Sequence, residues 1–142
     1  MSDSVNVPRW IMFAQRDYDA AYKMSIFHKP MPFEIVCYHC QQSVEKILKA
    51  YTLAHSDPLI KTHDLEAILK QCMEHDGQFI AFADICTVLT GYGIASRYPF
   101  DEDWINENDA KIALENAKTI LEFTKARLAE LGYSENGKET KD

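Results

Sequence analysis

Apolar side chains recur at three- and four-residue steps in five stretches of the chain, and the sustained alternation typical of strands is absent. The five stretches cover residues 8–27, 33–53, 63–76, 78–90 and 107–131. Such recurrence places the apolar residues on one side of a helix. The breaks between stretches hold turn-forming residues, namely Pro30, Pro32, Gly77, Gly91, Gly93 and Gly132. We therefore predict an all-α, up-and-down bundle of about five helices.

The second stretch has an apolar seam and, beside it, a polar stripe. The stripe consists of His39, Gln42, Lys46 and Lys49, whose spacings put all four side chains on one side of the helix. Lysine can contact phosphate as a point charge, and histidine and glutamine can hydrogen-bond a base or ribose. The stripe is our candidate ligand site. The alternative is a solvated or dimer-facing polar surface.

Asp17 lies on the apolar stripe of the first helix. A carboxylate at a buried seam is costly unless it is paired or well hydrogen-bonded. Its partner could be Lys46, Arg97 or the free N–H groups at the start of the third helix. We expect a structural role for Asp17, in which it locks the first helix to its neighbours.

Three polar residues mark the start of the third helix. Thr62 is the expected N-cap, and Asp64 suits the first turn, close to the positive end of the helix. His63 lies where backbone N–H groups favour anions, but we expect it to pack as a structural polar residue.

Arg97, Tyr98 and Pro99 lie between the fourth and fifth helices, in a stretch whose aromatic residues predict an ordered loop. Pro99 biases Tyr98 toward extended backbone. Arg97 and Tyr98 are therefore candidates for an anion clamp. In the alternative, Arg97 pairs with Asp17 or caps the carboxyl end of a helix. If Arg97 lies near the stripe, the two would form a small cationic recess.

The formal net charge is −7 over 142 residues. This charge argues against broad nucleic-acid binding, which needs a basic surface. The chain shows neither a signal peptide nor a stretch long enough to span a membrane, so we expect a cytoplasmic protein.

Four cysteines are present, at positions 37, 40, 72 and 86. Cys37 and Cys40 have the spacing of a redox motif or half a zinc site, but no second pair follows at zinc-site spacing. We expect free buried thiols, no metal and no cofactor. The folded domain should cover residues 8–132, and the polar tail 133–142 should be disordered.

Three runs of residues, taken in order, resemble a known family. Residues 37–50, CYHCQQSVEKILKA, resemble the second-helix signature of HEPN domains. Residues 62–65, THDL, resemble the start of that family's third helix, and residues 97–99, RYP, resemble its third landmark. The first helix, with its alanines and an acid, also fits, and the resemblance extends over about residues 9–131.

This resemblance implies a dimerising helical bundle, similar to the substrate-binding subunits of nucleotidyltransferases. Many members are encoded beside minimal nucleotidyltransferases and act with them as toxin–antitoxin-like pairs, and some are thought to bind nucleotides. Other members are metal-independent endoribonucleases that carry an Arg followed by a His, with four to six residues between them. Here no His follows Arg97, and Arg9 and Arg16 lack one at that spacing.

We therefore expect a noncatalytic protein that binds a nucleotide or another phosphate-bearing ligand, pairs with a nucleotidyltransferase as its partner protein, and forms a homodimer. The alternatives are an endoribonuclease that uses Arg97 without the usual His, and a purely structural dimerisation module.

Overall fold

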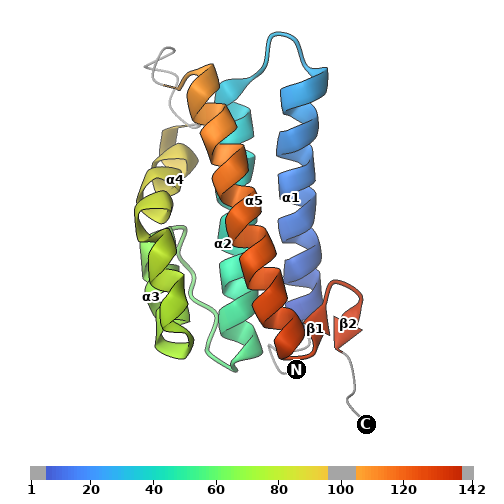
Figure 1. The fold of residues 1–142 in the computed structure, drawn as a ribbon, viewed down its shortest axis with the longest axis vertical. Helices are drawn as coiled ribbons and strands as arrows, with labels where there is room; N and C mark the ends of the chain where they lie inside the picture. Colours follow the sequence, from blue (N-terminus) through green and yellow to red (C-terminus); the bar gives the residue numbers. More distant parts are fainter. Residues whose placement is uncertain (1–5, 96–104, 139–142) are drawn as a thin grey trace.

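The computed structural model describes residues 6–95 and 105–138, and this part of the chain folds into a helical bundle (Figure 1). Its α-helices are α1 (Val7–Phe27), α2 (Phe33–Ala54), α3 (Leu65–His75), α4 (Ala83–Ala95) and α5 (Glu107–Glu130). A 3-10 helix, η2 (Gly77–Phe82), precedes α4, and a short hairpin of β1 (Tyr133–Ser134) and β2 (Gly137–Lys138) follows α5. The predicted all-α bundle of about five helices is confirmed.

Helix α2 is the central element of the bundle, since it contacts α1, α3, α4 and α5. In Figure 1 the long helices α1, α2 and α5 lie side by side, and α3 and α4 follow one another along one flank. The apolar seam expected on α2 is buried throughout, at Val36, Cys40, Val44, Ile47, Leu48 and Tyr51. Because α2 is enclosed on several sides, its polar residues also come into contact with neighbouring helices.

Helix α1 begins with Pro8 in its first turn and buries one stripe of apolar residues. The fully buried residues are Val7, Ile11, Ala14 and Ala21. Phe13, by contrast, is 36% exposed. The guanidinium carbons of Arg9 and Arg16 lie 5.7 and 5.6 Å from its ring centroid, so cation–π contacts partly shield this ring.

The fourth helix differs from the prediction at both ends. Residues 77–82 form η2 rather than α-helix, and α4 continues through Gly91 and Gly93 to Ala95. Glycine in a helix interior costs about 1 kcal/mol relative to alanine, which is why these glycines predicted a helix end. Packing overrides this cost, because Tyr92 is buried and Gly93 lies against the side chain of Gln41 on α2.

Helix α5 begins with a capping box between Asn106 and Asp109 and ends before Gly132, which has the left-handed φ of 88°. The tail beyond it was predicted to be disordered, and this is wrong for residues 133–138. They form the antiparallel pair β1–β2, and Tyr133 is only 6% exposed against α5 and α1. The buried aromatic ring of Tyr133 anchors this part of the tail to the bundle. Residues 139–142 lie outside the described residues.

None of the helices in the described ranges combines the length and the apolar character needed to cross a membrane.

Candidate functional site

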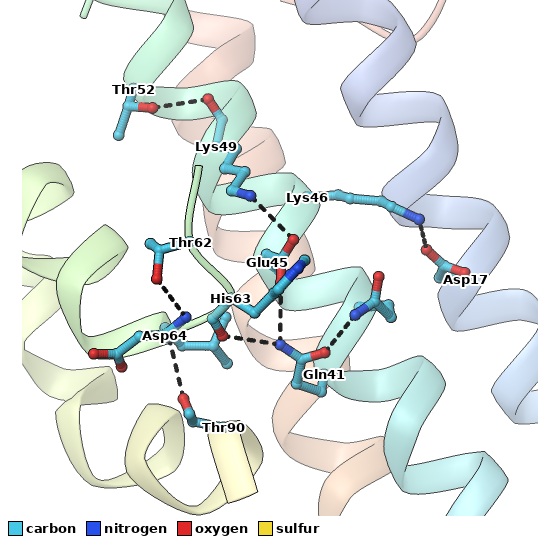
Figure 2. Close-up of polar contacts among 12 residues, drawn as sticks. Asp17, Gln41, Glu45, Lys46, Lys49, Thr52, Thr62, His63, Asp64 and Thr90 are labelled. Atoms are coloured by element: carbon cyan, nitrogen blue, oxygen red, sulfur yellow. Dashed lines mark hydrogen bonds and ion pairs between the residues drawn. The ribbon is translucent and has the colours of Figure 1, made fainter. Parts of the chain in front are cut away.

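Buried polar side chains gather on α2. Of the six buried polar or charged residues in the described part of the chain, all except Thr124 lie on this helix: Gln41, Ser43, Glu45, Lys49 and Thr52. Burying such groups is unfavourable unless each one finds a partner. The partners come from α1, from α2 itself and from the segment 61–64 that precedes α3, and together they form the polar cluster of Figure 2.

Asp17 on α1 pairs with two members of the predicted stripe. One carboxylate oxygen, Oδ2, accepts a close hydrogen bond from Lys46 Nζ, and the other, Oδ1, lies 3.3 Å from His39 Nδ1. The Asp17 side chain is 17% exposed, and those of His39 and Lys46 are each 26% exposed. Of the partners considered for Asp17, Lys46 is the one observed, and His39 joins it. These contacts connect α1 to α2.

Glu45, a residue that the sequence interpretation missed, is the second carboxylate of the cluster. Its Oε2 accepts from Lys49 Nζ at 3.1 Å, and its Oε1 lies 2.9 Å from His63 Nδ1. The Glu45 and Lys49 side chains are only 5% and 7% exposed. Lys49 also lies over the Trp10 ring, with its Nζ 5.8 Å from the ring centroid. The four-residue spacing of Glu45 and Lys49 was the available sequence signal.

Lys49 therefore does not share an open surface with the rest of the stripe. It was predicted as a ligand contact, but its ammonium is buried and faces Glu45 and Trp10. The physical reason is the position of Lys49 one further turn along α2, where Trp10 of α1 lies against its ammonium. His39, Gln42 and Lys46 remain partly exposed.

Two glutamines extend the hydrogen bonds around Glu45. Gln42 Nε2 donates to Gln41 Oε1 at 2.7 Å. Gln41 Nε2 in turn lies within hydrogen-bond distance of Glu45 Oε1 (3.2 Å) and of the His63 carbonyl (3.3 Å). Gln41 is 1% exposed, and a Cβ at Gly93 would lie 3.3 Å from its Cδ. The glycine in α4 thus leaves room for the amide that holds the segment 61–64 against α2.

The start of α3 differs by two residues from the prediction. Asp64, rather than Thr62, is the N-cap, and its Oδ1 accepts from the Glu66 N–H at 3.0 Å. Thr62 Oγ1 accepts from the Asp64 N–H at 3.1 Å and so supports the cap. The Leu65 N–H donates to Thr90 Oγ1 of α4 at 3.1 Å. These N–H groups at the helix start are therefore already satisfied by protein atoms.

Arg97 and Tyr98, the two other predicted site residues, lie outside the described residues. Of the predicted stripe, the structure brings His39 and Lys46 together around Asp17. Gln42 is instead connected, through Gln41, to Glu45 and the His63 carbonyl.

The two lysines do not form the simple cationic recess that was expected. Each ammonium pairs with a carboxylate, Lys46 with Asp17 and Lys49 with Glu45, so with neutral histidines the four charges cancel. Lys46 nevertheless retains three N–H donors and partial exposure, and one bond to Asp17 leaves donors for a ligand oxygen. The arrangement can therefore present hydrogen-bond donors at positions that internal carboxylates hold in place.

The cysteines are separate from this cluster. All four are free and buried. Burial raises the pKa of Cys37 to about 12, and it raises the pKa of Cys40 still further. A raised pKa keeps these thiols protonated, which disfavours both redox and metal chemistry. Within the described ranges, no group of three or more His, Cys, Asp or Glu side chains is arranged to hold a metal ion.

In the comparison with protein families, the model described as the HEPN domain matches residues 7–128. The matched stretch runs from the start of α1 to near the end of α5 and therefore includes the whole polar cluster. Comparison with curated proteins gives no match, and comparison with solved structures gives none.

Proposed function

The chain belongs to the HEPN domain family, and from that premise we propose that it is the noncatalytic, nucleotide-binding partner of a minimal nucleotidyltransferase. The two proteins would form a toxin–antitoxin-like pair in the cytoplasm, where thiols stay reduced. We also propose that the chain forms a homodimer. The family resemblance supports both the nucleotidyltransferase partner and the homodimer. The ligand class is also supported by the residues of the polar cluster.

The observation that carries the ligand proposal is the pairing of Lys46 with Asp17 across α1 and α2. A partly buried ion pair with solvent access adds little to stability, because desolvation offsets much of the Coulomb attraction. It does hold an ammonium in one position, and preorganised charge is what a phosphate site needs. Lys46 would bind a phosphate oxygen, and His39 and Gln42 would hydrogen-bond the base or ribose.

The noncatalytic part of the proposal rests on the sequence. The ribonuclease members of the family have an Arg followed by a His, with four to six residues between them. None of the four arginines here has such a His: Arg9, Arg16, Arg97 and Arg127. Without that His, the pair of groups that would move a proton and stabilise phosphate charge is incomplete.

Calorimetric titration with ATP, GTP and a short RNA tests the proposal. We expect a nucleotide to bind, and Lys46→Gln, which keeps a donor for Asp17 but removes the charge, to weaken binding by about tenfold or more. The matched control is Lys125→Gln. Lys125 is also a partly exposed lysine with a carboxylate partner, Glu135, but it lies on α5 outside the cluster.

Three results would count against this function. No heat from any of the ligands would refute nucleotide binding. RNA cleavage that is lost in Arg97→Ala would favour the endoribonuclease alternative. A change in the monomer–dimer balance of Lys46→Gln, with unchanged ligand affinity, would favour the purely structural module.

A further inference from the structure

His63 is held in place at two points, yet its ring faces solvent. Its carbonyl accepts from Gln41 Nε2, and its ring Nδ1 lies 2.9 Å from Glu45 Oε1 (Figure 2). The side chain is 69% exposed, whereas the Glu45 side chain is 5% exposed. Among the described residues, none forms a hydrogen bond or ion pair with the other ring nitrogen, Nε2. A buried carboxylate thus orients an exposed imidazole.

This contact determines which nitrogen carries hydrogen. A carboxylate only accepts hydrogen bonds, so Nδ1 must be the N–H donor toward Glu45. In the neutral ring Nε2 is then an acceptor. A phosphate oxygen is also an acceptor, and it can bind Nε2 only after Nε2 gains a proton. Contact between His63 and an anionic ligand therefore requires the imidazolium form.

The groups around His63 can accommodate that positive charge. Glu45 lies against Nδ1 and is shared with Lys49, while Lys61 and Asp64 belong to the same segment as His63. Asp64 is engaged as the α3 N-cap. From α4 the neutral Thr90 hydroxyl accepts a hydrogen bond from the Leu65 N–H at the start of α3. Glu45, Lys49 and His63 together would carry a net positive charge when His63 is protonated, and no net charge when its ring is neutral.

We propose that His63 is a ligand-contacting residue of the nucleotide site, which takes up a proton when a phosphate-bearing ligand binds, with Glu45 as its positioning residue. This inference rests on the proposed function and adds to it: the lysine charges are matched internally, so the charge that attracts the anion comes from a histidine. It also changes the role expected for His63 from structural packing to binding.

Calorimetry with ADP at pH 7.5, in buffers of different ionisation enthalpy, measures the proton uptake. We expect uptake approaching one proton per ADP. Affinity should fall by about tenfold per pH unit above the range in which histidine loses its proton. His63→Gln keeps an N–H donor for Glu45 but cannot become charged, so it should bind with little net uptake and an affinity that is nearly constant between pH 6.5 and 8.

The control is His28→Gln, at an exposed histidine on the C-cap of α1 that forms no hydrogen bond or ion pair with the described residues of this cluster. This variant should retain both the proton uptake and the pH dependence of ADP affinity. Because all variants are titrated with the same ligand, the protons that ADP itself exchanges contribute equally and cancel in the comparison. Nitrogen-15 NMR of the free protein at pH 8 should show His63 with its hydrogen on Nδ1.

Binding of ADP without proton uptake, or uptake that persists in His63→Gln, would overturn this inference and leave the proposed function intact. A hydrogen on Nε2 in the NMR spectrum would also overturn it, whether or not ADP binds. Absence of binding by ADP, ATP and GTP would overturn the proposed function and this inference together.

Discussion

At the scale of single residues, Glu45 and Lys49 form the most deeply buried ion pair of the polar cluster. Removing both charges from water is costly, and their attraction repays this cost only because additional donors, Gln41 and His63, complete the carboxylate's hydrogen bonds. Such a pair adds little stability over a well-packed apolar pair. Removing one partner is strongly destabilising, because the other charge then remains buried and unmatched.

We therefore predict that Glu45→Ala lowers the free energy of unfolding by about 3–5 kcal/mol, because it strands the Lys49 ammonium. The double variant Glu45→Met, Lys49→Met should recover most of this loss. Urea unfolding measures both. Lys111→Ala, which breaks the exposed pair with Glu107 on α5, should change stability by no more than about 0.5 kcal/mol. A small loss in Glu45→Ala would show that Lys49 finds water or another partner.

His55 and His75 form a second titratable group, away from the site. Their rings stack with centroids 4.0 Å apart, and His75 Nε2 lies 2.6 Å from Asp57 Oδ2. Burial, followed by the proximity of His75, lowers the pKa of His55. The unfolded chain, in which this pKa is higher, therefore binds a proton at His55 more readily than the folded protein does.

The sign of the pH effect follows from this difference. The contribution of His55 favours the folded state at pH values above its unfolded pKa and is lost as the pH falls below that value, toward the lowered folded pKa. We predict that the thermal midpoint drops between pH 7.5 and 5.5, and that it drops less in His55→Phe, which keeps an aromatic ring in the stack. Equal decreases in the two proteins would contradict the assignment to His55.

At the scale of elements, the contact between α4 and α2 depends on Gly93. A Cβ at this position would lie 3.3 Å from Gln41 Cδ, which is tighter than ordinary van der Waals contact. Gln41 cannot easily move away, because it is buried and its amide is bonded to Gln42, Glu45 and His63. A glycine that weakens its own helix thus allows two helices to approach at the polar cluster.

We predict that Gly93→Ala destabilises the fold by about 1 kcal/mol or more, despite the higher helix propensity of alanine. Gly77→Ala is the matched control, since a Cβ there meets no atom within 4 Å, and it should be neutral or stabilising by up to about 1 kcal/mol. Chemical denaturation compares the two. A stabilising Gly93→Ala would mean that Gln41 can shift without losing its hydrogen bonds.

At the scale of the whole molecule, the fold places its polar cluster along the middle of the central helix. Helix α2 spans 22 residues, and the charged and amide side chains of the cluster lie at residues 39–49. They are bordered by α1 and by the segment that leads into α3. The molecule carries a formal net charge of −7, and the lysines of the cluster are matched by carboxylates. The anion binding that we propose for this site would therefore depend on local geometry rather than on a basic surface.

Much of the fold could be predicted from local patterns. The apolar seam of α2, the break at Pro30 and Pro32, and the end of α5 before Gly132 follow from helical periodicity and from residues that stop helices. Two wrong predictions share one cause, which is contact across elements. Packing extends α4 past its glycines, and burial of Tyr133 orders residues that read as a polar tail.

By itself, the sequence determined the helices, the faces that they bury and the presence of a polar stripe on α2, because the helical period relates residues that are three or four positions apart. Only the tertiary structure decided that Asp17 pairs with Lys46 and His39, that Lys49 is buried, and that Glu45 orients His63. These partners lie on different elements, or become buried when other elements pack over them. Their pairing depends on how the helices pack, which no local period encodes.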